Sequence, residues 1–196
     1  MDQNVIILLV VVTAALIVGF LLWQRNRSVT LRKKYGDEYA HAVRTTGDTR
    51  RAEQELEKRE KRVKEFKLHP LTPDQQRSFD QKWASIQAFF VDEPSRAVQE
   101  ANLLIKDVMA ARGYPVGDFE QRAADVSVHY PRVVQNYRTA HTIADRNSRG
   151  EANTEDLRLA LVCYRELFAD LLEKSKVETR NYQEVTKSQL EIEKML

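Results

Sequence analysis

Two acid–histidine pairs are the residues best suited to chemistry in this 196-residue chain. Asp125 and His129 are four residues apart, as are His141 and Asp145, so the members of each pair share one face of a helix. Carboxylate and imidazole groups bind metals, and the four side chains together favour a helical enzyme or metal-binding domain as one interpretation. The other interpretation is that each histidine is hydrogen-bonded to its neighbouring carboxylate, which assigns no catalytic residue, no metal and no cofactor.

A further candidate for chemistry is the thiol of Cys163, the only cysteine of the chain. It stands between Val162 and Tyr164 in an apolar helical stretch, whereas reactive thiolates need an electropositive and partly exposed setting. We therefore expect a buried, inert thiol. The chain has no glycine-rich phosphate loop, no serine nucleophile elbow and no His-Glu-x-x-His motif. These observations favour a protein that is not an enzyme.

Arginine and tyrosine side chains gather between two proline corners of the central region. These two residue types recur at interface hot spots, which favours an anion- or protein-binding surface. The alternative is that the arginines pair with nearby acids and the tyrosines fill the core. The candidate interaction surface comprises Arg112, Tyr114, Arg122, Tyr130, Arg132, Tyr137, Arg138 and His141.

The composition limits the elements that can position these residues. Hydrophobic residues make up 42% of the chain and charged residues 31%, which excludes a protein with several membrane spans. A single cysteine excludes a disulfide scaffold. Only 6 Gly and 5 Pro occur, so long helices are favoured over a turn-rich sandwich or barrel.

Apolar residues are concentrated near the N-terminus. Residues 5–23 contain no charge, and a helix of this length spans roughly 28 Å, close to the hydrocarbon core of a bilayer. A cleaved signal peptide is the alternative, but the stretch is longer than its apolar region and lacks a basic leader. We predict an uncleaved transmembrane anchor over residues 1–24.

Charge around this span predicts its orientation. No Lys or Arg precedes it, and five follow closely, so the positive-inside rule places the N-terminus outside and the remainder in the cytoplasm. An exported domain on the same anchor is the topological alternative. The residues expected at the membrane interface, beside anionic headgroups, are Trp23, Arg25, Arg27, Arg32, Lys33 and Lys34.

Residues 25–69 are predicted to form a basic, helical juxtamembrane stalk. Residues 25–67 contain 14 basic and 8 acidic side chains. Leu56, Val63 and Phe66 are the only large apolar residues of the second stalk helix and occupy heptad positions. Two heptads favour a solvated helix over a dimeric coiled coil, which remains the alternative. Nucleic-acid binding is not expected, because no basic face with interleaved aromatic residues appears.

Residues 70–175 are predicted to form a bundle of four or five helices. Apolar side chains recur at helical spacing through Phe79, Trp83 and Ile86, and again through Leu157, Tyr164 and Phe168. The segment 72–75 is typical of a capping box with proline at the first helical position. Residues 176–196 form a charged amphipathic helical tail in this prediction. No segment alternates like a strand, so the expected fold class is all-α.

Several short blocks carry a resemblance over roughly residues 31–172. Arg112-Gly113-Tyr114-Pro115 and Asp118-Phe119-Glu120-Gln121-Arg122-Ala123 are the most distinctive. With these blocks the chain resembles a family of small bacterial single-pass membrane-anchored helical proteins, often described as secreted. Members of that family carry Asp-His before the proline where this chain has His129-Tyr130, so no role is carried over to His129. The resemblance implies a bacterial, anchored helical protein and supplies no mechanism.

The sequence as a whole predicts a membrane-tethered helical interaction or scaffold module. It would recruit a protein partner to the cytoplasmic face of a bacterial inner membrane. A helical enzyme or metal-binding domain that uses Asp125, His129, His141 and Asp145 is the alternative function. Self-association into a homodimer through Ala15-x-x-x-Gly19, a small-xxx-small pair, also stays open.

Overall fold

The structure is a computed structural model that describes the backbone of residues 3–195 and the side chains of residues 11–13, 15–19, 25–173, 175 and 177. Within these limits every regular element is a helix, which confirms the predicted all-α class. The chain divides into two compact units, residues 1–57 and residues 58–196. The helices are α1 (Gln3–Tyr35), α2 (Asp37–Thr46), α3 (Thr49–Lys64), α4 (Pro73–Phe89), α5 (Pro94–Ala111), α6 (Phe119–His129), α7 (Val134–Ser148) and α8 (Thr154–Met195).

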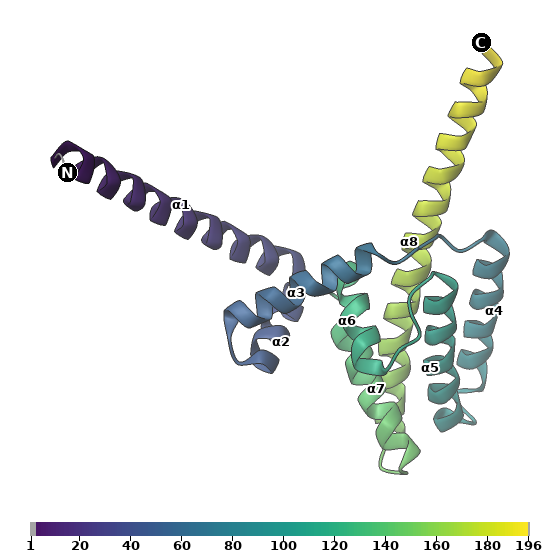
Figure 1. Ribbon diagram of the computed structural model, residues 1–196. Helices are drawn as coiled ribbons and strands as arrows, with labels where there is room; N and C mark the ends of the chain where they lie inside the picture. Colours follow the sequence, from purple (N-terminus) through teal and green to yellow (C-terminus); the bar gives the residue numbers. More distant parts are fainter. Residues whose placement is uncertain (1–2, 196) are drawn as a thin grey trace. The chain divides into compact units, whose positions relative to one another are not determined.

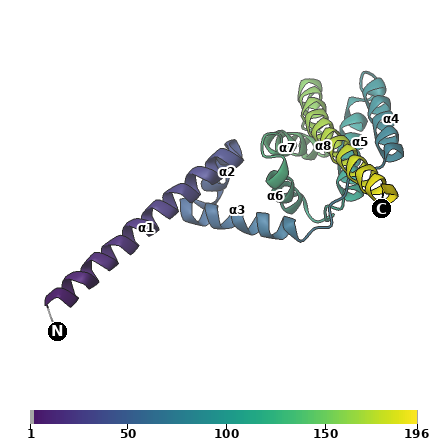
Figure 2. The same cartoon turned by 90° about the horizontal axis from the view of Figure 1, so that it is seen from above.

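The second unit is a helical bundle built around α5 and α8. Helix α5 packs against α4, α7 and α8, while α7 also packs against α6 and α8 (Figure 1). Figure 2 shows the same bundle along a second direction. The predicted apolar stripes form its core, and the rings of Trp83 and Phe168 stack with their centroids 4.9 Å apart. Helix α8 continues past the core to Met195, so the predicted tail is helical over its described residues.

The helix starts follow the local capping signals. Thr72 and Gln75 form the expected capping box at α4, and Asp118 accepts a hydrogen bond from the Gln121 backbone N–H at α6. Helix α7 begins at Val134, three residues after Pro131. The reason is a preceding turn, in which the carbonyl oxygen of Tyr130 accepts hydrogen bonds from the backbone N–H groups of residues 133 and 134.

Residues 65–72, which we call the strap, connect α3 to α4 across the bundle. The His69 N–H donates to the carbonyl oxygen of Arg112 at 3.2 Å. The buried Leu71 N–H donates to the Ser175 hydroxyl of α8 at 2.6 Å. At the end of α5, Gly113 has φ +89°, and a Cβ there would lie 2.5 Å from the Lys67 carbonyl oxygen. Glycine at this position therefore permits both the left-handed turn and the close approach of the strap.

The first unit contains a small core of its own, and this corrects the predicted solvated stalk. The chain reverses at Gly36 (φ +52°) and Gly47 (φ +71°), so α1, α2 and the first turns of α3 pack on one another. The Tyr39 hydroxyl donates to the buried Glu53 carboxylate at 2.8 Å. Leu56 is thereby buried within its own chain. The core residues are Leu31, Tyr35, Tyr39, Ala42, Ala52 and Leu56.

The predicted anchor falls mostly on residues whose side chains lie outside the described set. Among the described residues, no helix is both long enough and apolar enough to cross a bilayer. The structure therefore does not support the transmembrane segment, which stays a prediction from the sequence. Trp23 belongs to the residues without a described side chain. Arg25, Arg32, Lys33 and Lys34 are exposed, whereas Arg27 is half-buried and pairs with Glu57.

Candidate functional site

Most of the arginine and tyrosine residues predicted to form an interaction surface are in the interior of the second unit. Five of the eight are buried, and Tyr137 has no exposed surface at all. Residues closed off from solvent cannot contact a partner, so the predicted surface is not formed by this set. The buried members are Arg112, Tyr114, Arg122, Tyr130 and Tyr137.

The two buried arginines hold helices together through neutral acceptors. Arg112, the C-cap residue of α5, donates to the Tyr130 hydroxyl and, at 3.0 Å, to the Leu171 carbonyl oxygen of α8. Arg122 of α6 donates to the carbonyl oxygen of Gly117 and to the Tyr137 hydroxyl, the latter at 3.4 Å. Buried guanidinium groups are tolerated when such hydrogen bonds replace those of water. These residues therefore position α5, α6, α7 and α8.

The remaining three members lie nearer the surface. Arg132 is exposed, and Arg138 and His141 are half-buried. The His141 ring stacks on Phe119, with ring centroids 3.6 Å apart, and Phe119 also contacts the Tyr137 ring at 5.0 Å. Burial lowers the pKa of His141 below its ordinary value, with Arg122 and Lys106 contributing and Asp145 and Glu120 opposing. His141 is thus held as a neutral imidazole at neutral pH.

Three of the four residues proposed as metal ligands have hydrogen-bond or ion-pair partners that are separate from one another. Asp125 is buried and accepts hydrogen bonds from Gln121 at 3.0 Å and from Arg62 of α3 at 3.2 Å. Burial raises the pKa of Asp125, against the hydrogen bond from Gln121 and the charge of Arg62.

His129 and Asp145 of that set are paired elsewhere. His129 is hydrogen-bonded to the Tyr114 hydroxyl at 2.8 Å, and Asp145 pairs with Arg149 at 2.5 Å. In the part of the chain that the structure describes, no three His, Cys, Asp or Glu side chains lie close enough to share a metal ion. The structure therefore gives no geometric support to the metal-binding interpretation.

Cys163 is buried in α8, as the sequence predicted. Burial raises the pKa of its thiol, and the charge of Glu166 acts in the same direction. A thiol with a raised pKa carries little of the thiolate form that reacts. Cys163 is consequently a packing residue of the core.

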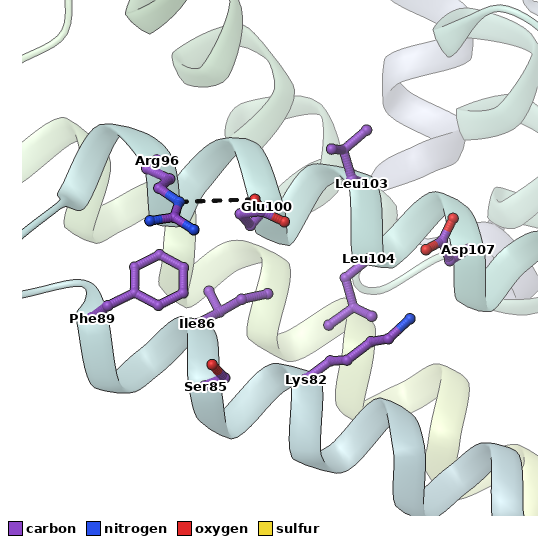
Figure 3. A pocket seen from close by; sticks show the side chains of 9 residues that line it. All are labelled: Lys82, Ser85, Ile86, Phe89, Arg96, Glu100, Leu103, Leu104 and Asp107. Carbon is purple, nitrogen blue, oxygen red and sulfur yellow. Dashed lines mark ion pairs between the residues drawn. The ribbon is translucent and has the colours of Figure 1, made fainter.

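A groove with a volume of about 300 Å³ lies between α4 and α5 on the surface of the bundle. Figure 3 shows Ile86 and Leu104 between the two helices and Phe89 at one end. The Arg96–Glu100 ion pair lies beside Phe89, and Lys82 and Asp107 lie at the far end. The α4–α5 groove, as we call it, is lined by Lys82, Ser85, Ile86, Phe89, Arg96, Glu100, Leu103, Leu104 and Asp107.

A second hollow, the α5–α7 cavity, lies next to this groove. It has a volume of about 310 Å³ and is lined by Gln99, Asn102, Leu103, His141, Ala144, Asp145 and Ser148. Leu103 lines both hollows and is 53% exposed. It forms an apolar ridge between them and points away from α4 (Figure 3).

The sequence interpretation missed both hollows. Leu103 lies outside the apolar stripe of α5 that passes through Leu104 and Val108, and this offset was the one signal that could have marked it. An apolar side chain off the stripe points to solvent unless another molecule covers it. Val91, in the turn between α4 and α5, is a second such residue and is 85% exposed.

Comparison of the chain with family models, curated proteins and solved structures finds no match. The resemblance drawn from the sequence blocks therefore stays a prediction. What the chain can bind follows from the geometry of its own residues.

Proposed function

We propose that this protein is a membrane-tethered adaptor whose helical bundle binds an amphipathic helix of a partner protein in the α4–α5 groove. The tether is the N-terminal apolar segment, in the inner membrane of a bacterium. The bundle faces the cytoplasm. Tethering raises the effective concentration of the partner at the membrane, so a modest affinity for the groove is sufficient.

The tether is supported by the described part of α1. Its apolar side chains between residues 11 and 18 are open to the surroundings, with exposed fractions of 46–68% for Val11, Val12, Leu16, Ile17 and Val18. A continuous apolar surface of this kind is typical of a segment that contacts lipid or another protein. The basic excess that follows it in the sequence favours lipid and the cytoplasmic side for the bundle.

The shape of the α4–α5 groove is the observation that carries the docking function. Its α5 wall runs from Arg96 to Asp107, which at the rise of a helix is a length of about 16 Å, or three turns. Ile86 and Leu104 provide an apolar floor, and charges of both signs stand at each end. A groove with an apolar floor and charged ends suits an amphipathic helix, whose apolar face enters it.

Site-specific photocrosslinking tests the docking function. A benzophenone amino acid is placed at Leu103, and at Leu159 as the matched control, since Leu159 is an exposed leucine of α8 outside the groove. We expect one discrete adduct from the Leu103 position in intact cells and none from Leu159. A peptide with the crosslinked partner segment should become helical on binding the purified full chain.

Leu103→Asp should weaken that binding about tenfold or more, because a carboxylate is then buried against an apolar surface. Leu159→Asp should leave the binding unchanged. Equal adducts at both positions, absence of an adduct, or a peptide that binds without becoming helical would show that the groove is not a helix-docking site.

The tether and its orientation are tested by a reporter fused after Leu196. We expect the fusion to sediment with membranes and to be active with a reporter that works only in the cytoplasm. Neutral replacement of Arg25, Arg32, Lys33 and Lys34 should weaken or invert this orientation, because these cations follow the apolar segment. A wild-type fusion that is active only with an export-dependent reporter would refute the cytoplasmic location.

A further inference from the structure

Two buried polar atoms next to the α5–α7 cavity have no hydrogen-bond partner in the described part of the chain. They are Oδ1 of Asn102 on α5 and Nδ1 of His141 on α7, and both residues line the cavity. A buried acceptor without a donor is costly, and native structures keep few of them without a ligand or water to supply the hydrogen bond. Two such atoms from facing helices at one cavity indicate a ligand that donates hydrogen bonds.

The electrostatic setting indicates an uncharged donor. Among the described residues that line the cavity, Asp145 is the only acid, and it forms an ion pair with Arg149 at 2.5 Å. The charges that act on His141 from further away comprise two acids, Asp145 and Glu120, and two bases, Arg122 and Lys106. A cationic or anionic ligand would find no unpaired opposite charge among the described residues that line the cavity. A neutral group with two N–H donors needs no such charge.

We propose that the α5–α7 cavity binds a neutral primary carboxamide, which is the side chain of a Gln or Asn residue on the docked partner helix. The amide nitrogen of such a group carries two hydrogens, one for Asn102 Oδ1 and one for His141 Nδ1 in the neutral tautomer whose hydrogen is on Nε2. As the source of the carboxamide is the partner helix, this inference rests on the docking function proposed above. Leu103 borders both hollows, so one helix in the α4–α5 groove is adjacent to the cavity.

A small rotation of the Asn102 amide turns its acceptor toward such a ligand. The terminal amide torsion of Asn102 is broad, so the amide can turn toward the cavity without leaving a preferred rotamer. The His141 ring is held from one side by its stacking on Phe119, which fixes the plane in which Nδ1 accepts. Gln99, also on α5, carries an amide that can donate to the carbonyl oxygen of the ligand. The cavity therefore offers both donors and acceptors to a carboxamide.

Disulfide tethering tests the carboxamide chemistry without the partner. Leu103→Cys places a thiol on the cavity wall of the full chain, while the native Cys163 is buried. The protein, in detergent, equilibrates with equal amounts of the symmetric disulfides of β-mercaptopropionamide and of methyl β-mercaptopropionate, an ester of similar size that has no donor. Each adduct forms by thiol–disulfide exchange, in which the Cys thiolate attacks the reagent disulfide and one reagent thiol leaves. Intact-mass spectrometry gives the ratio of the two adducts. Leu159→Cys, at an exposed position away from the cavity, is the matched control.

We expect the carboxamide adduct to exceed the ester adduct about fivefold at the Leu103→Cys site, equivalent to about 1 kcal/mol, and a ratio near one at the control site. Asn102→Leu or His141→Phe should bring the ratio at the Leu103→Cys site toward one. Equal labelling by the two reagents would overturn the proposal and indicate a cavity filled by solvent only. The same assay is run with the disulfides of cysteamine, which is cationic, and of β-mercaptopropionate, which is anionic. A preference for either charged reagent over the carboxamide would also overturn the proposal.

The tethering result is independent of the crosslinking result. Selective carboxamide labelling together with failed crosslinking would remove the docked helix as the source while keeping the chemistry of the cavity. Successful crosslinking with unselective labelling would retain the docking function and refute the carboxamide.

Discussion

Gly113→Ala is expected to destabilise the bundle by about 2–5 kcal/mol. The left-handed backbone at φ +89° costs a residue with a Cβ about 1–2 kcal/mol. The new Cβ would also lie 2.5 Å from the Lys67 carbonyl oxygen, and this backbone atom can move only if the strap moves. Overpacking of this kind costs about 1–3 kcal/mol more. The free energy of unfolding is measured in urea by far-ultraviolet circular dichroism.

Gly150→Ala is the matched control for this effect. Gly150 also has a positive φ, +73°, but a Cβ added there would have no other atom within 4 Å. The Gly150→Ala variant should therefore lose only the backbone contribution to the free energy of unfolding, about 1–2 kcal/mol. The difference between the two variants therefore measures the contact between the strap and the end of α5. Equal losses at both glycines would contradict the close packing of the strap on Gly113.

Trp83→Ala and Phe168→Ala are each expected to lower the free energy of unfolding by about 3–5 kcal/mol. The two rings are buried at the contact of α4 with α8 and stack at 4.9 Å with an interplanar angle of 18°. Each truncation removes the apolar burial of one ring and the stacking partner of the other. Because the residues touch, the double variant should lose about 0.5–1.5 kcal/mol less than the sum of the single losses.

Leu159→Ala provides the comparison for this pair. Leu159 lies on α8 as Phe168 does, but it is 47% exposed. Its truncation should change the stability far less, since little apolar surface returns to water. Losses at Trp83 and Phe168 no larger than at Leu159 would show that the predicted stripes do not form the core. Strict additivity of the double variant would argue against the stacked pair.

The helices and most of their starting points were predictable because the signals are local. The capping box of Thr72 with Gln75 and the cap of Asp118 act within one turn of helix, so the sequence alone indicates them. The apolar stripes of α4, α5 and α8 repeat at the helical period and identify the core face of each helix.

The candidate site was not predictable to the same degree, because burial depends on which helices meet. Arginine is a residue type that recurs at interfaces, yet Arg112 and Arg122 are interior residues that hold helices together. The acceptor of Arg112 is the Leu171 carbonyl oxygen, 59 residues further along the chain. No spacing rule connects residues so far apart. The solvated stalk was wrong for the same reason, since Leu56 is covered by residues of α1 and α2.

The sequence by itself determined the fold class, the helix caps and the apolar face of each helix, because these depend on neighbours within a few residues. It also contains the apolar N-terminal segment and the basic charge that follows it, from which the tether is inferred. The tertiary structure decided which polar residues are interior and where the surface is hollow. Leu103 is a ridge between two hollows because α4 lines one of them and α7 lines the other, with α5 common to both. Such surfaces arise from packing between helices, which local patterns do not encode.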